Sequence, residues 1–172
     1  MRIQILALVS LFVLTLSCKN KQESNSTAGV EVNKSQEITE QEISKLKYID
    51  YALDEKTEDA IEDWAQYRQL RDVIDDVKEG DLSFFNDNEK AIKLLLKELK
   101  DDIPETIASS SILARILVVE TKFYKLESLS NLSTTSKEEL LEAIQEFLVS
   151  FSNLNLQMNK KIEFDTRTIE RP

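Results

Sequence analysis

The chain has 172 residues, a formal net charge of −10 and no histidine. It contains one cysteine, two glycines and two prolines. Sheet-rich folds need glycine and proline for tight turns and close backbone approach, so this composition argues against sandwiches, barrels and Rossmann folds. It favours helices joined by polar loops. An acidic chain repels phosphate backbones, which argues against nucleic acid as a partner.

The start of the chain has the pattern of an export signal. Met1 and Arg2 precede an almost unbroken apolar run over residues 3–16. This run suits the hydrophobic region of a signal peptide and is too short to span a bilayer comfortably. Cys18 follows, and the sequence then turns polar. We therefore expect residues 1–17 to be a signal peptide that is removed on export.

The residues before Cys18 read Leu14-Thr15-Leu16-Ser17. They resemble the lipobox of bacterial lipoproteins, in which a diacylglycerol is attached to the cysteine thiol before the leader is cut. Thr15 stands where the family usually has leucine. The resemblance implies lipid attachment at Cys18, with palmitate among the acyl chains. The alternative is an ordinary secretory signal with a chance cysteine, which would leave an unpaired thiol in an oxidising compartment.

Residues 18–37 are polar and lack periodicity, so we expect a flexible tether between the lipid and the body. Two acyl chains on one residue would anchor the protein stably to a membrane. Lys19 stands where lipoproteins held at the inner membrane often carry aspartate. The resemblance therefore implies the bacterial cell envelope, at the outer membrane.

The rest of the chain, residues 38–172, is expected to form one all-α domain, an antiparallel up-down bundle of four to five helices. The first and weakest helix is predicted from the spacing of Ile43, Leu46, Ile49 and Leu53. Thr39 and Glu42 would form its capping box. A second helix is predicted over residues 57–79, with Gly80 as a left-handed cap.

Three further helices complete the expected bundle. One covers residues 87–101 and ends before Pro104. The next covers residues 112–129, and its many apolar side chains predict that it is enclosed on several sides. The last begins near Lys137, after a capping box formed by Ser136 and Glu139, and continues to about Ile162.

Short strings in the body resemble uncharacterised small exported helical proteins of Gram-negative bacteria. The strings are Gly80-Asp81-Leu82-Ser83-Phe84-Phe85, Ile103-Pro104, Ala114-Arg115-Ile116-Leu117 and Glu120-Thr121. The resemblance covers roughly residues 50–160 and implies no activity.

The residue inventory argues against most catalytic chemistry. Without histidine the chain lacks the usual general base and the commonest metal ligand. Its single cysteine is assigned to the anchor, and two glycines cannot build a phosphate-binding loop. We expect no catalytic residue, no metal site and no cofactor. An enzyme that uses paired carboxylates is a less favoured alternative.

Four carboxylates share one face of the second long helix, at Asp72, Asp75, Asp76 and Glu79. Such a face could bind a divalent cation, and residues 75–86 partly match a calcium-binding loop. Val77 and Asn86, however, stand where that loop needs ligands. A solvated acidic face is the favoured interpretation.

Arg115 is the one basic residue in the apolar run of residues 112–119. It could line an anion pocket together with Glu120, which makes these two the candidate ligand-binding residues. The favoured alternative places Arg115 at the rim of the core or in an ion pair with a carboxylate such as Glu120.

The four aromatic residues Phe84, Phe85, Trp64 and Tyr67 could form an exposed docking patch. Core packing is favoured for them, because aromatic side chains at helical spacing are usually buried.

These observations lead to one functional hypothesis and one alternative. The hypothesis is a non-enzymatic, helical interaction or structural module of the envelope, anchored to a membrane through the lipid on Cys18, that binds another envelope protein. The alternative is a lipoprotein that binds a ligand or ion between helices or on the acidic face.

Overall fold

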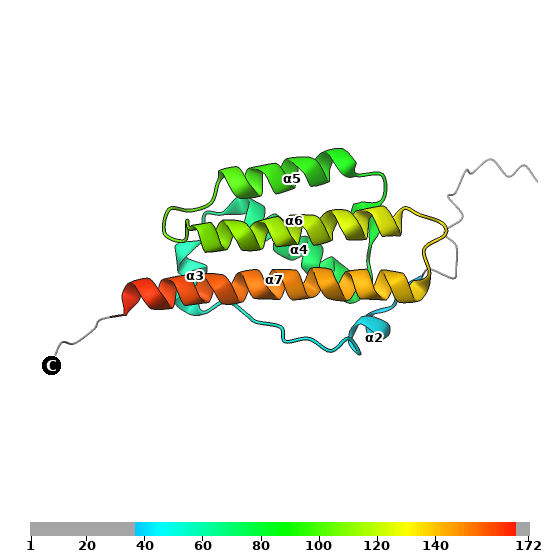
Figure 1. Cartoon of the computed structure of the whole chain (residues 1–172), viewed down its shortest axis with the longest axis horizontal. Coiled ribbons are helices and arrows are strands. Elements are labelled where there is room, and N and C mark those ends of the chain that lie inside the picture. Colours follow the sequence, from blue (N-terminus) through cyan, green and yellow to red (C-terminus); the bar gives the residue numbers. More distant parts are fainter. Residues whose placement is uncertain (1–36, 168–172) are drawn as a thin grey trace, which may run out of the picture. The chain divides into compact units, whose positions relative to one another are not determined.

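The structure, a computed structural model, describes residues 37–167; the leader, Cys18 and most of the tether lie outside this range. The described residues contain only helices and loops, which confirms the predicted all-α class (Figure 1). The elements are α2 (Glu40–Ile43), α3 (Glu55–Ala60), α4 (Ala65–Glu79), the 3-10 turn η1 (Ser83–Phe85), α5 (Glu89–Asp101), α6 (Ser110–Ser130) and α7 (Lys137–Thr166). Among them, no helix is long and apolar enough to cross a bilayer.

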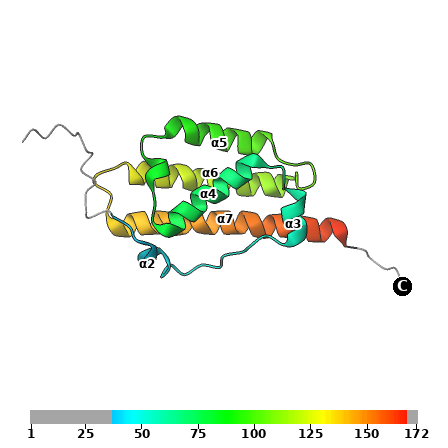
Figure 2. The same ribbon diagram turned by 180° about the vertical axis from the view of Figure 1, so that it is seen from behind.

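Helices α5, α6 and α7 lie side by side in both views, each antiparallel to the next, and α4 crosses one face of this layer (Figures 1 and 2). The core fills the space between α4 and the layer. Leu70, Ile74 and Val77 of α4 are fully buried, as are Ile116 and Phe123 of α6. Burial of this apolar surface stabilises the domain at about 25 cal/mol per Å² removed from water.

The α6–α7 hairpin is held by both apolar and charged contacts. Phe123 and Phe147 meet edge to face with ring centroids 5.0 Å apart. On the surface, Lys122 and Lys125 lie 3.1 and 2.7 Å from the carboxylate of Glu146. The hydrogen bond from Lys125, with that from Lys122, lowers the pKa of Glu146 despite partial burial. The fold thus favours the charged form of this side chain.

The capping box predicted at the start of α7 is confirmed. The Glu139 N–H donates to Ser136 Oγ (3.2 Å), and the Ser136 N–H donates to the Glu139 carboxylate (2.9 Å). These bonds satisfy main-chain groups that the first helical turn leaves without partners. The hydrogen bonds that the Glu139 carboxylate accepts from the N–H and the hydroxyl of Ser136 lower the pKa of Glu139.

The single helix predicted over residues 57–79 is wrong, because a turn over residues 61–64 divides it into α3 and α4. Ile61 leaves the helical region with φ −121° and ψ 13°, and both Ile61 and Trp64 are buried in the turn. Helix α3 packs against α7, and α4 packs against both α5 and α7. The turn between them buries Ile61 and Trp64 in the core, so tertiary packing overrides the apolar periodicity.

The helix predicted around Ile49 is also wrong. Helix α2 ends at Ile43, and residues 47–54, called the strap below, form no helix. The strap passes along α7 (Figure 1). The main-chain N–H and C=O groups of the strap form hydrogen bonds with side chains of α7. These groups are therefore not available for the main-chain hydrogen bonds that a helix needs.

Gly80 ends α4 in the left-handed region, with φ 89°, as predicted. A Cβ at this position would lie 2.9 Å from the carbonyl oxygen of Ile38. Both the positive φ and the close approach favour glycine. The residue thereby allows the segment before α2 to pack against the end of α4.

Candidate functional site

Helix α6 is more open than its sequence predicts. Leu113, Leu117 and Val118 are 41%, 47% and 42% exposed, so the expectation that α6 is enclosed on several sides is wrong. The reason is the single-layer arrangement: α5 and α7 flank α6, and α4 covers only one of its two remaining faces (Figures 1 and 2).

The structure does not bring the candidate residues Arg115 and Glu120 together. The Glu120 carboxylate accepts hydrogen bonds from Lys100 of α5 at 2.6 and 2.8 Å, and it does not pair with Arg115. Arg115 is exposed and makes no hydrogen bond or ion pair with any residue between 37 and 167. Of the two positions expected for Arg115, the structure fits the rim and not the ion pair with a carboxylate such as Glu120.

The acidic residues of α4 form no cation site in the part of the chain that the structure describes, where no group of three carboxylate, histidine or cysteine side chains is placed to hold a metal ion. Asp75 to Glu79 are helical, so the first part of the calcium-loop pattern does not adopt a loop conformation. Asp72, Asp75, Asp76 and Glu79 are exposed to solvent.

Three of the four aromatic residues proposed as an alternative docking patch belong to the core, and the fourth, Phe84, is partly buried against it. Trp64 and Tyr67 are each 2% exposed, and Phe85 is fully buried. They form two separate clusters: Trp64 stacks on Tyr67, whereas Phe84 and Phe85 contact Phe123. The interpretation as core is confirmed.

A face whose one charged side chain is Arg115 extends across α6 and α7, opposite the face that α4 covers. In α7, residues 147–159 contain no charged side chain, and residues 108–119, which include the start of α6, contain only Arg115. The two segments are neighbours, since Gln157 Nε2 lies 3.5 Å from Ser111 Oγ. We call the solvent-reaching side chains here the α6–α7 face: Ala114, Leu117, Val118, Val149, Asn153 and Leu156. It is unusual in a chain in which 31% of residues are charged.

Another side of α7 binds the strap through four polar side chains, Gln145, Ser152, Asn155 and Asn159. Their spacing places them along one side of the helix. Ser152 Oγ donates to the Ile49 carbonyl (2.6 Å) and accepts from the Tyr51 N–H (2.8 Å).

Asn159 repeats this double contact further along the strap. Its amide donates to the Ala52 carbonyl (2.9 Å) and accepts from the Asp54 N–H (3.0 Å). Gln145 donates to the Lys47 carbonyl at 2.9 Å. In all these hydrogen bonds the strap contributes main-chain groups. They therefore do not depend on which side chains the strap carries.

Asn155 joins the strap to the core. Its amide nitrogen donates to the Tyr51 carbonyl (3.0 Å), and its amide oxygen accepts from the Tyr67 hydroxyl (2.8 Å). Burial raises the pKa of Tyr67 strongly, so the phenol stays protonated and remains a donor. The two bonds fix the orientation of the Asn155 amide.

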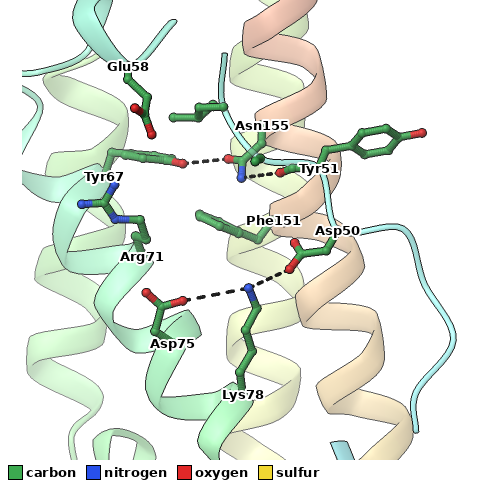
Figure 3. Close-up of a pocket in the computed structure, with 11 residues that line it drawn as sticks. Asp50, Tyr51, Glu58, Tyr67, Arg71, Asp75, Lys78, Phe151 and Asn155 are labelled. Atoms are coloured by element: carbon green, nitrogen blue, oxygen red, sulfur yellow. Dashed lines mark hydrogen bonds and ion pairs between the residues drawn. The ribbon is translucent and has the colours of Figure 1, made fainter. Parts of the chain in front are cut away.

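Beside the hydrogen bond between Tyr67 and Asn155 lies a partly open cavity of about 200 Å³ (Figure 3). It is formed where the strap, α3, α4 and α7 meet. Its walls are Asp50, Tyr51, Ala52 and Leu53 of the strap, Glu58 of α3, Tyr67, Arg71, Asp75 and Lys78 of α4, and Phe151 and Asn155 of α7. The cavity thus combines an aromatic wall with charged side chains of both signs.

Lys78 is held at the lower edge of the cavity in Figure 3. Its ammonium group lies 2.8 Å from Asp50 and 3.9 Å from Asp75. Burial lowers the pKa of Lys78, but the hydrogen bond and charge of Asp50, with smaller contributions from Tyr48 and Asp75, outweigh this and leave the pKa raised. The ion pair ties the strap to α4.

Neither the cavity nor the strap was predicted from the sequence. The available signal was the row of amide and hydroxyl side chains in the longest described helix, where polar residues at helical spacing indicate a bound polar partner. The sequence could not show that the strap is this partner, because the strap bonds through main-chain atoms, which every residue has. Arg71 carried no signal in the sequence.

No family model, curated protein or solved structure matches this chain.

The Asn155→Ala substitution should destabilise the domain by about 2 kcal/mol, because it leaves the buried Tyr67 hydroxyl without an acceptor and the Tyr51 carbonyl without its donor. Urea unfolding of the purified full-length protein measures this. Asn153→Ala, two residues earlier on α7 and without such bonds, is the matched control and should cost less than about 0.5 kcal/mol. Equal losses for the two variants would contradict the role assigned to Asn155.

Proposed function

We propose that this protein is a non-enzymatic envelope lipoprotein, anchored to the outer membrane through a lipid on Cys18, whose helical domain binds another envelope protein. The anchor is supported by the lipobox-like sequence and the polar stretch of residues 18–37. The non-enzymatic role is supported by the lack of histidine in the whole sequence and by the assignment of its one cysteine to the lipid.

The observation that carries the interaction role is the α6–α7 face. Leu117 and Val118 are nearly half exposed, and no described element covers them. Exposed apolar side chains that stand singly need no explanation, but an area over two neighbouring helices with Arg115 as its one charged side chain is typical of protein–protein contact.

The charge distribution indicates the partner's chemistry. Residues 37–88 hold sixteen acidic and six basic side chains, whereas residues 89–130 hold seven of each. A partner approaching α2 to α4 meets net negative charge, while one approaching α6 does not. We therefore assign to the α6–α7 face a protein that presents an uncharged, apolar helix surface of its own. The second chain of a self-associated dimer and the lipid surface are the competing occupants.

The anchor is tested by Cys18→Ser. The substituted protein should lose incorporation of labelled palmitate and move from the membrane fraction to the soluble fraction of fractionated cells, because no thiol remains to carry the diacylglycerol. A serine substitution at an exposed residue of the body, such as Asp72→Ser, is the control and should change neither. Retention of label and membrane association in Cys18→Ser would contradict the proposed anchor.

The docking face is tested with a photo-crosslinking amino acid placed at Leu117 or Val118 in intact cells, and at Asp72 on α4 as control. One defined protein should be captured from both α6 positions and not from Asp72. Val118→Glu should weaken binding of that purified protein to the full chain by tenfold or more, since it places a charge in an apolar contact.

Three results would contradict the proposed partner. Capture of only a second copy of the chain would assign the face to self-association, and capture of only lipid would assign it to the membrane. Capture of the same proteins from Asp72 as from Val118 would show that the face has no special role.

A further inference from the structure

Two charged side chains in the wall of the cavity have no partner. Arg71 and Glu58 make no hydrogen bond or ion pair with any residue in the described range 37–167. The remaining cation, Lys78, is already engaged by Asp50 and Asp75. The cavity therefore offers a ligand one free guanidinium group and one free carboxylate.

The charged groups follow one edge of the cavity with alternating sign. Figure 3 shows Glu58, then Arg71, then Asp75 along this edge, with Lys78 beyond. A simple anion that reached Arg71 would also meet the negative charges on both sides of it, and a simple cation would meet Arg71. A small molecule that carries one positive and one negative charge complements the alternating charges of this edge best.

The inner wall is backed by two aromatic rings that are almost fully buried, with Tyr67 2% and Phe151 4% exposed. The rings of Tyr67 and Phe151 are stacked, with centroids 5.7 Å apart and planes 18° apart. The hydroxyl of Tyr67 and the amide of Asn155 are already bonded to each other. Ala52 and Leu53 of the strap also line the cavity and are more exposed than the rings. Together with the ring edges they suit an apolar side chain, whose burial would contribute to binding in proportion to its area.

The size of the cavity limits the ligand. Its volume of about 200 Å³ exceeds the roughly 150 Å³ of an engineered cavity that holds benzene. It is smaller than the roughly 300–1,000 Å³ of pockets that bind drug-sized molecules. A molecule with about ten non-hydrogen atoms is therefore the expected size.

We propose that this cavity binds a free α-amino acid with an apolar side chain. The guanidinium group of Arg71 binds the ligand carboxylate, as this planar donor group pairs well with carboxylates. The ammonium group faces the acidic side chains of the edge, of which Glu58 has no other partner. The apolar side chain lies against Ala52 and Leu53 of the strap and the edges of Tyr67 and Phe151. The strap forms the opposite wall, so the site exists only while α7 holds the strap in place.

The proposal is tested by calorimetric titration of the full-length protein with L-leucine and two analogues. These are 4-methylpentanoate, which lacks the ammonium group, and 3-methylbutylamine, which lacks the carboxylate. L-leucine should bind saturably, and each analogue should bind at least tenfold more weakly. Absence of saturable binding by L-leucine, or equal affinity for either analogue, would overturn the proposal.

Two substitutions locate the site. Arg71→Gln should weaken L-leucine binding at least tenfold. Arg68→Gln is the matched control, because Arg68 lies on the same helix outside the cavity, bonded to the carbonyl of Glu62. Glu58→Gln should weaken binding of L-leucine and leave 4-methylpentanoate unaffected. Equal effects of Arg71→Gln and Arg68→Gln, with unchanged unfolding curves, would place the binding elsewhere and overturn the assignment.

This site is independent of the proposed docking face, because the two lie on different sides of α7. Failure of L-leucine binding leaves the crosslinking result unaffected, and failure of crosslinking leaves the titration unaffected. The two proposals can therefore be rejected separately.

Discussion

The arrangement of the domain depends on the hydrogen bonds by which α7 binds the strap. An extended segment without a partner strand has N–H and C=O groups that must be satisfied by other means, since burying them without partners costs free energy. Ser152, Asn155 and Asn159 supply those partners from one helix side. The strap can therefore remain extended along α7, and α3, which follows it, packs against α7. The chain then turns at residues 61–64 before α4 begins.

The same interaction creates the cavity. The strap supplies one wall, and the amide of Asn155 holds both the strap and the hydroxyl of Tyr67. On a different side, α7 contributes to the α6–α7 face. One helix thus serves three surfaces: the core, the strap with its cavity, and the face proposed to bind a protein. A change on the strap side should alter the cavity and leave the docking face intact.

The parts of the fold that depend on apolar periodicity were predictable from sequence. The helices α5, α6 and α7, the cap at Gly80 and the capping box at Ser136 follow from spacing and local chemistry. The failures have a common cause. Around Ile49 and between α3 and α4, tertiary contacts override a helical pattern that the local sequence does carry.

The candidate sites were harder to predict for a related reason. The exposure of Leu117 depends on how many helices surround α6, and this number is a property of the whole arrangement. The cavity brings together Glu58, Arg71 and Asn155 from three helices. Nothing in the local sequence of any one of these residues indicates the other two.

The most direct test of this account is amide hydrogen exchange of the strap in the folded full-length protein, followed residue by residue. The N–H groups of Tyr51 and Asp54 should be strongly protected, because they donate to Ser152 Oγ and Asn159 Oδ1. The neighbouring Leu53 N–H, which has no such acceptor among the described residues, should exchange faster. Exchange of Tyr51 and Asp54 at the rate of an unstructured peptide would show that α7 does not hold the strap, and the account of the cavity would be wrong.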